Sequence, residues 1–233
     1  MIQIENIEVF GFEAAIRGMR NPLNSWEMSD SSYKESECRY IIGENDKRLM
    51  KKLTSAGSDH GKYTRMINVT MDITAPLYWW KEYDTYKVGT VANSCSTMHK
   101  IHAKEFTPDD FSHEHLMSSV EKAETELLDI DKVETNIFVT PKSLLNITIG
   151  CLNHYRKMYL ETNDKDWWWQ MIQLLPSSYN QKRTVQVNYE VLKSMYFARK
   201  GHKLDEWRSF CQTIKTLPYF EELFLEGGNE IDN

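Results

Sequence analysis

Cysteine and histidine side chains gather in one polar stretch of the chain and could, by type, bind a metal or supply a nucleophile. Cys95, His99 and His102 follow one another closely, and His113 and His115 come soon after. Cys95 and His99 would share one face of a helix if the segment were helical. Zinc sites usually show tighter paired spacings, and a catalytic thiolate needs a nearby cation or helix N-terminus. We therefore predict no metal site, and an unreactive thiol among solvated histidines.

A second candidate, "GKYT" from Gly61, resembles the end of a phosphate-binding loop only superficially. Its upstream glycine, Gly57, is too close, and no strand precedes the segment. The preceding "SDH", which ends at His60, is typical of a surface turn.

Arginines supply the remaining candidate chemistry. Arg17, Arg20 and Arg39 could line an anion pocket or could be solvated surface cations. Arg199 lies near the end of a predicted helix, where a cation is favourable. Asn188 falls inside the same predicted helix, and because asparagine is a mediocre helix former, its position favours a polar contact.

The composition of the chain limits the classes of function in which these residues could take part. The chain has 233 residues, of which 41% are hydrophobic and 27% are charged, as in a globular protein with one main domain. The net charge of -6 gives no general attraction to nucleic acid. No apolar run approaches the roughly 18 residues that span a membrane, and the first residues lack a secretory pattern. The four cysteines form no CxxC pair, so we expect free thiols and a cytoplasmic location.

The spacing of apolar residues predicts the strands and helices that carry these candidate residues. Alternating apolar and polar residues predict strands over 2–10 and 64–76, with Gly11 bending the chain after the first. A short helix or turn is predicted from Glu13, stopped by Pro22. Helical spacing, capping residues, glycines and prolines predict helices over 45–55, 77–89, 107–117, 118–135, 140–162, 165–175, 185–201 and 204–217. Residues 90–106 are predicted to form an exposed loop that leads into a short element. The fold class is therefore α+β: a small antiparallel sheet packed with a helix-rich second half.

Two segments carry a resemblance to a known family. "INVTMDITAPLYWWKEYDTYKVGTVANSCS" and "LLPSSYNQKRTVQVNYEVLKSMYFARKGHKLDEW" resemble the flavin-dependent thymidylate synthases. In that family a strand ending in Ala-Pro or Ser-Pro leads through a helix to an RHR motif, and a serine follows seven residues later. Aligned without gaps, Thr85, Tyr86 and Lys87 occupy the motif, and Cys95 occupies the serine position.

Further positions match by type or by place. Asn188 falls on the family's flavin-side asparagine and Arg199 on its nucleotide-binding arginine. His60, in "AGSDHGKYTRM", matches the first histidine of a Gly-His-Glu turn. Glu82 stands where the family has a glutamine, and Asn93 where it has an acid. A flavin-packing histidine is replaced by Met66, and the arginine before Leu-Pro by Ile172 or Gln173.

The resemblance implies an enzyme that converts dUMP to dTMP. FAD would transfer a hydride, NADPH would reduce the flavin, and methylenetetrahydrofolate would donate the carbon. It also implies a homotetramer with active sites between subunits. Residues 1–233 would form a single domain, with a diverged segment at 1–44 and a flexible tail at 225–233.

The roles that the resemblance implies can be stated residue by residue. Catalytic roles fall on Tyr86, Lys87 and Cys95, although the family makes no covalent cysteine attack and the loop around Cys95 instead shapes the nucleotide pocket. Cofactor contacts fall on Thr85, Tyr86, Asn188 and His60. Substrate contacts fall on Glu82, Lys87, Thr90, Asn93, Cys95 and Arg199.

Two alternatives remain. A nucleotide monophosphate is a dianion that arginines hold through bidentate bonds, and the altered motif removes such groups. Lys87, Arg199, and Arg17 or Arg20 are the available substitutes. The chain could therefore act on another pyrimidine nucleotide, or bind one without turnover. A structural or interaction protein, with the charged segment 118–135 as its surface, is the other alternative.

Overall fold

The computed structural model describes residues 2–119 and 139–226. These residues form two compact units, which are described separately below. Of the described residues, unit 1 contains 75–80, 94–119 and 139–181, and unit 2 contains 2–74, 81–93 and 182–226. The predicted helix 118–135 and the predicted flexible tail fall largely outside the described residues, and the single domain predicted for 1–233 stays a prediction.

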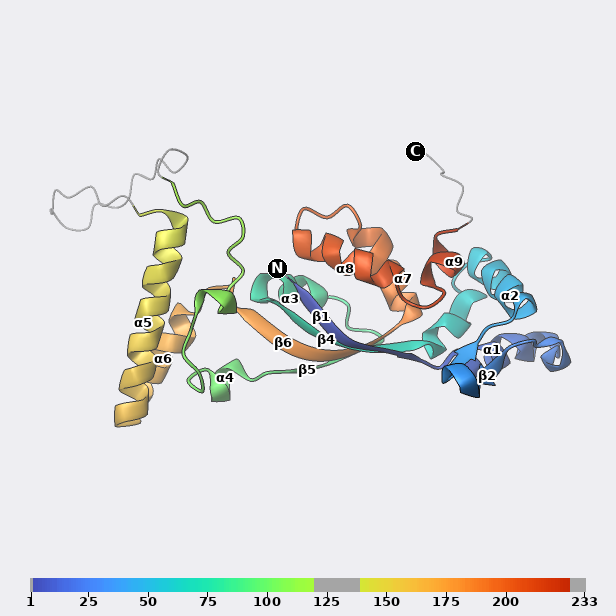
Figure 1. Ribbon diagram of the computed structural model, residues 1–233, viewed down its shortest axis with the longest axis horizontal. Helices are drawn as coiled ribbons and strands as arrows, with labels where there is room; N and C mark the ends of the chain where they lie inside the picture. The colour runs from blue at the N-terminus through green and yellow to red at the C-terminus, as the bar shows by residue number, and fades with distance from the viewer. Residues whose placement is uncertain (1, 120–138, 227–233) are drawn as a thin grey trace. The chain divides into compact units, whose positions relative to one another are not determined.

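A four-stranded sheet, in the order β1-β4-β6-β5, belongs mainly to unit 2 (Figure 1). Its strands are β1 Gln3–Phe10, β4 Asn68–Pro76, β5 Thr90–Ser94 and β6 Asn180–Asn188. β1 and β4 pair in antiparallel register. The predicted alternation in β4 is confirmed, because Val69, Met71 and Ile73 are buried while the polar residues between them are half-buried. The strand starts later than predicted, since a 3-10 helix, η4, occupies Gly61–Met66.

Helices of unit 2 complete its core. Their bounds are α1 Phe12–Arg20, α2 Glu44–Ser55, α7 Tyr189–Arg199, α8 Asp205–Lys215 and α9 Phe220–Phe224. Figure 1 shows α7 and α8 on the same side of the sheet. The inner stripe of α8, which includes Trp207, Phe210 and Ile214, is buried, as its three-to-four spacing predicts. A small hairpin pairs β2 Ser32–Lys34 with β3 Arg39–Ile41.

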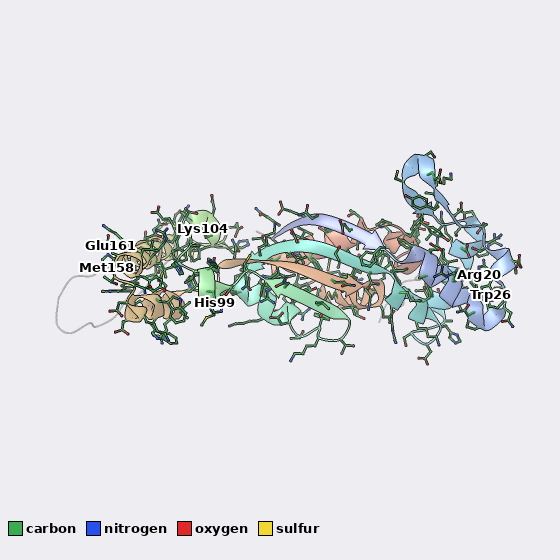
Figure 2. All side chains as sticks on the ribbon, turned by 90° about the horizontal axis from the view of Figure 1, so that it is seen from below. Arg20, Trp26, His99, Lys104, Met158 and Glu161 are labelled. Carbon is green, nitrogen blue, oxygen red and sulfur yellow. The ribbon has the colours of Figure 1, made fainter. Side chains whose placement is uncertain are left out.

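Unit 1 is built around two neighbouring helices, α5 Pro141–Thr162 and α6 Lys165–Leu174 (Figure 1). The predicted start of α5 is confirmed: Pro141 is the first helical residue, and the Thr140 hydroxyl accepts a hydrogen bond from the Ser143 N–H. The core of this unit comprises Ile101, Phe106, Phe111, Leu145, Ile149, Leu152 and Met171. Figure 2 labels Met158 and Glu161 near the end of α5. No described helix is both long and apolar enough to cross a membrane.

Four sequence predictions of local structure were wrong. The helix predicted over 77–89 is α3 Leu77–Tyr83 and ends early. The exposed loop predicted after it begins with strand β5, whereas the short element predicted to follow is present as α4 Thr97–Lys100. The Thr107 signal starts only a single 3-10 turn, Pro108–Asp110, because the chain turns extended again at Phe111. The helix predicted from 185 is a strand up to Asn188, as the buried Val185 and Val187 with exposed Gln186 between them show.

Arg20 lines a pocket of about 410 Å³ together with Arg48 and Lys52, but its guanidinium is engaged in a buried ion pair. Its Nε lies 2.6 Å from Asp46 Oδ1, and the two side chains are 4% and 0% exposed. Asp46 also accepts hydrogen bonds from the Ser29 and Ser31 hydroxyls. Figure 2 shows Arg20 in α1 beside the segment that carries Trp26. Arg17 pairs with Glu13 at the exposed surface, and the side chain of Arg39 is not described.

The predicted bend at Gly11 is confirmed and has a steric cause. Gly11 adopts φ +98° between β1 and α1, which is the left-handed region that favours glycine. A Cβ at this position would lie 2.1 Å from the Met66 carbonyl oxygen. Because that atom belongs to the backbone of η4, a side chain here would push two elements apart.

Gly11→Ala is expected to lower the free energy of unfolding by more than about 1 kcal/mol, because the native φ is incompatible with alanine. The matched control is Gly150→Ala in α5, where a Cβ would meet nothing within 4 Å. That control should raise stability by roughly 0.5–1 kcal/mol. Urea unfolding of the two variants measures both effects, and a Gly11→Ala protein with the wild-type midpoint would contradict the steric argument.

Candidate functional site

Hydrogen bonds within the segment that follows α3 hold it in a tight turn. The Thr85 hydroxyl donates to the Glu82 carbonyl at 2.7 Å, and the Tyr86 N–H donates to the Tyr83 carbonyl at 3.0 Å. The Thr90 hydroxyl donates to the Tyr86 carbonyl. These bonds fix the direction in which Tyr86 leaves the turn, because its own backbone is held from both sides.

Gly89 and Asn188 lie against each other where this segment meets α7. Gly89 has φ +80°, and a Cβ there would lie 2.9 Å from Asn188 Nδ2. Asn188 is the N-cap of α7, and its Oδ1 accepts the Val191 N–H at 3.0 Å. The prediction that Asn188 lies inside a helix was therefore wrong, but the polar contact that motivated its selection exists. Its Nδ2 remains the donor that points toward the Gly89 segment.

Glu82 is the centre of the best-defined polar cluster in unit 2. Its Oε2 lies 2.6 Å from Arg199 Nη1 and 3.1 Å from the Trp207 indole nitrogen. His202 Nε2 lies 3.3 Å from the same oxygen. The Arg199 Nε–H donates to the Tyr86 hydroxyl at 3.1 Å. One carboxylate oxygen thus accepts hydrogen bonds from Arg199 in α7 and Trp207 in α8, with His202 from the connection between these helices close by.

Aromatic rings enclose the guanidinium of this cluster. The Arg199 Cζ lies 4.9 Å from the Trp207 ring centroid and 5.7 Å from the Tyr86 ring centroid. Both distances are within the range of cation–π attraction. The side chains of Arg199 and Glu82 are 21% and 34% exposed, so the cluster is partly open to solvent. An anion or a flat ring could reach it from the outside.

The structure therefore brings three predicted residues together, Glu82, Tyr86 and Arg199, with Thr90 bonded behind them. Trp207 and His202 join them and were missed as site residues. The sequence did carry a signal for Trp207, since it closes the second family-like segment, but the spacing alone gave it no role. His202 had no comparable signal.

Three other predicted residues of unit 2 take no part in this cluster. Thr85, Lys87 and Asn93 are exposed. Within the described ranges, no ion pair is formed by Lys87, so its ammonium faces solvent. Their predicted contacts with nucleotide or flavin stay predictions.

His60 lines a separate pocket of about 740 Å³ in unit 2. One wall is apolar and includes Met19, Leu23, Leu53 and Met66. His60, Lys62 and Arg65 add basic groups to the same lining, and Asp59 adds one acidic group. An apolar wall beside basic side chains suits a flat ring system that carries phosphate.

Hydrogen bonds connect this pocket to the Asn188 cap. The Thr64 hydroxyl lies in η4, which forms part of the pocket lining, and donates to Glu190 Oε2 at 3.1 Å. The Tyr189 N–H donates to the Ile67 carbonyl at 2.9 Å. The lining of the pocket and the start of α7 are therefore fixed to each other within unit 2.

The cysteine and histidine candidates of unit 1 form no common site. The Cys95 thiol is exposed, and its backbone carbonyl accepts a hydrogen bond from Gln181 Nε2 at 2.8 Å. His102 packs edge-on against Tyr159, and His113 Nδ1 donates to the Phe111 carbonyl. In the part of the chain that the structure describes, no three His, Cys, Asp or Glu side chains gather around a possible metal position.

Comparison with known proteins gives a likeness of fold. No family model and no curated protein matches the sequence. Thymidylate synthase X from Helicobacter pylori, solved with FAD and dUMP, is similar with a TM-score of 0.63 and 16% identity, covering 97% of this chain and 98% of that one. A second structure of the flavin-dependent enzyme from Helicobacter pylori, complexed with FAD and dUMP, is similar at 0.62 and 16%, covering 96% and 98%. The chain therefore has the α+β fold of the flavin-dependent thymidylate synthases, as the sequence resemblance predicted.

Proposed function

We propose that the protein is a flavin-dependent enzyme that acts on a pyrimidine nucleotide, with reductive methylation of dUMP to dTMP as its reaction. The observation that carries the proposal is the Glu82 cluster, in which residues chosen through the family resemblance meet on a fold of the same length. Bound FAD would supply hydride, NADPH would reduce it, and methylenetetrahydrofolate would supply the carbon. The chain's own residues would bind and orient these groups.

The nucleotide would bind beside Tyr86 and Arg199. Tyr86 offers an aromatic ring against which a pyrimidine can pack. Lys87 offers a cation for the phosphate, whereas Arg199 offers one whose charge is shared with Glu82. Thr90 supports Tyr86 from behind, and Asn93 and the Cys95 loop complete the set that the resemblance implies. No role as a nucleophile is proposed for Cys95.

The residues of the His60 pocket fit a flavin. Its apolar wall suits the ring system, and Lys62 and Arg65 suit the diphosphate, since both carry fixed positive charge at neutral pH. Asn188 caps α7, whose first residues are hydrogen-bonded to η4 and Ile67, and the family resemblance implies its contact with the flavin. Thr85 would contact the flavin from the exposed turn.

We also propose that the protein is a homotetramer. The hairpin of α5 and α6 exposes large apolar side chains: Leu144 and Ile147 are 56% and 53% exposed. Trp169 and Leu174 on α6 are exposed as well. Several large apolar side chains left exposed on one pair of helices are typical of a surface that binds another protein.

A cytoplasmic location is proposed from the cysteines. Cys38, Cys95, Cys151 and Cys211 are all free thiols. Free thiols persist in a reducing compartment.

Flavin uptake tests the proposed function most directly. The purified protein should be yellow or should take up added FAD, and dUMP should then raise its melting temperature. His60→Ala should weaken FAD uptake by about tenfold, since loss of one charge-assisted contact has that size. His99→Ala, an exposed histidine in unit 1, serves as the matched control and should bind FAD as the wild type does. A wild-type protein that takes up no FAD would overturn the proposal.

A second candidate function is favoured by the same cluster. Glu82 neutralises the cation that a nucleotide phosphate would need, so the protein could act on a related pyrimidine compound instead of dUMP. Complementation of a thymidine auxotroph separates the two functions. Growth supports dUMP methylation, whereas well-expressed protein without growth supports the second candidate.

A further inference from the structure

We propose that Glu82 sets the charge preference of the candidate site. By holding Arg199 in a closed ion pair, it disfavours a phosphomonoester relative to the corresponding uncharged nucleoside. The inference rests on the proposed function only in taking a pyrimidine nucleoside as the ligand. It is based on the hydrogen bonds that the Arg199 guanidinium and the Glu82 carboxylate form.

The guanidinium has two edges on which it can bind a phosphate through two parallel bonds. One edge presents Nη1 and Nη2, and the other presents Nε and Nη2. In Arg199, Nη1 donates to Glu82 and Nε donates to Tyr86. Each edge therefore contains a nitrogen that is already engaged. A phosphate can bind bidentately only by displacing one of these partners.

The negative charge of Glu82 also disfavours a phosphomonoester. The Glu82 carboxylate lies 2.6 Å from the nitrogen that a phosphate would approach, so the incoming anion meets a like charge beside the cation. The two side chains are only 21% and 34% exposed, and screening by salt is weaker there than at an open surface. An uncharged nucleoside does not meet this repulsion.

The pair is also anchored against rearrangement. The Trp207 indole N–H donates to Glu82 Oε2 at 3.1 Å, and His202 Nε2 lies 3.3 Å from the same oxygen. The Trp207 ring lies against the guanidinium of Arg199. Swinging either charged group away would break several contacts at once, so the bound ligand has to accommodate the pair.

Glu82→Gln removes the charge with little change of shape. The amide oxygen can still accept from Trp207 and Arg199, and the guanidinium becomes a cation with no counter-charge beside it. The matched control is Asp84→Asn, which removes an equal charge two positions along the chain. Asp84 pairs with Arg183 at 2.8 Å and is more exposed.

Calorimetric titration of the full-length protein with dUMP and with 2′-deoxyuridine tests the proposal. We expect Glu82→Gln to improve the affinity for dUMP relative to deoxyuridine by about tenfold or more, the usual size of a hydrogen bond to a charged group. Asp84→Asn should leave that ratio within about twofold of the wild type, since an exposed pair contributes little. An unchanged ratio in Glu82→Gln would overturn the proposal.

A second measurement is independent of nucleotide binding. The indole N–H resonance of Trp207, assigned through Trp207→Phe, reports directly on its bond to Glu82. Inorganic phosphate should shift this resonance in Glu82→Gln and leave it in place in the wild type. Equal shifts in both proteins, or no shift in the variant, would refute the role of Glu82. If phosphate behaves as expected while no variant binds dUMP or FAD, the proposed function fails and the charge assignment stands.

Discussion

Asp46→Asn is expected to lower the free energy of unfolding by about 3–5 kcal/mol, the usual cost of removing one partner of a buried ion pair. Arg20 would keep its charge in a position that is 4% exposed, with no anion to balance it. The hydroxyls of Ser29 and Ser31 would lose a charged acceptor at the same time. Urea unfolding at pH 7 measures the loss.

The control for this prediction is Glu13→Gln. Glu13 forms the same type of pair with Arg17, but the two side chains are 65% and 67% exposed. Removing that carboxylate should cost no more than about 0.5 kcal/mol. The argument from burial is wrong if the two variants lose similar amounts of stability.

The same carboxylate predicts a dependence on pH. Burial by itself raises the pKa of Asp46, but hydrogen bonds from Ser31, Ser29 and Arg20 outweigh it and hold the pKa below its ordinary value. Because the folded state binds the proton less readily than the unfolded state, the stabilisation is complete above the unfolded pKa of about 3.9. It is lost as the pH falls through the lower folded pKa. The Asn variant should lack this part of the acid-induced loss of stability.

Trp207→Ala is expected to cost about 3–5 kcal/mol of stability, as large-to-small substitutions of buried aromatic residues do. The residue is 0% exposed and packs edge-on against Phe210. The substitution also removes the ring beneath the Arg199 guanidinium and a donor to Glu82. Thermal unfolding measures the first effect, and binding of dUMP to the FAD-loaded protein measures the second.

Trp207→Phe separates packing from hydrogen bonding. It keeps an aromatic ring in the core but loses the indole N–H, so it should recover about half of the lost stability. A loss of about 1.5–3 kcal/mol is expected for the missing bond to a charged acceptor. Trp169→Ala on α6, where the residue is 40% exposed, should cost much less than Trp207→Ala. Equal losses at both tryptophans would contradict the core position of Trp207.

The elements predicted correctly are those whose signal is local. The strand Asn68–Pro76 shows alternation over its whole length, and α5 begins with a Thr-Pro pair that caps it without help from elsewhere. β6 was missed because its alternation covers few residues and runs directly into α7. β5 was missed because it carries little apolar surface and depends on pairing with β6. Because β6 lies far from β5 along the chain, the local sequence around β5 does not reveal this pairing.

Several residues of the candidate site could be predicted from the sequence, but the contacts between them could not. Tyr86, Glu82 and Arg199 could be selected through the family resemblance, yet their mutual contacts join the end of α3 to the end of α7. The buried ion pair of Arg20 was not predicted for the same reason. Its partner, Asp46, lies in another helix, and the sequence around Arg20 does not indicate that the side chain is buried. Pairing between distant segments is set by the tertiary fold, and a single sequence shows only its parts.

The order of the strands also dictates when the protein can fold during synthesis. β4 occupies an inner position between β1 and β6, and it ends at Pro76, whereas β6 begins only at Asn180. On the ribosome, a β1–β4 pair would have to wait with one unpaired edge until the rest of unit 1 had emerged. Contacts of such wide sequence separation slow folding. The nascent chain should therefore acquire protease resistance only after Asn188 leaves the exit tunnel, and truncated chains that end before β6 should bind chaperones strongly.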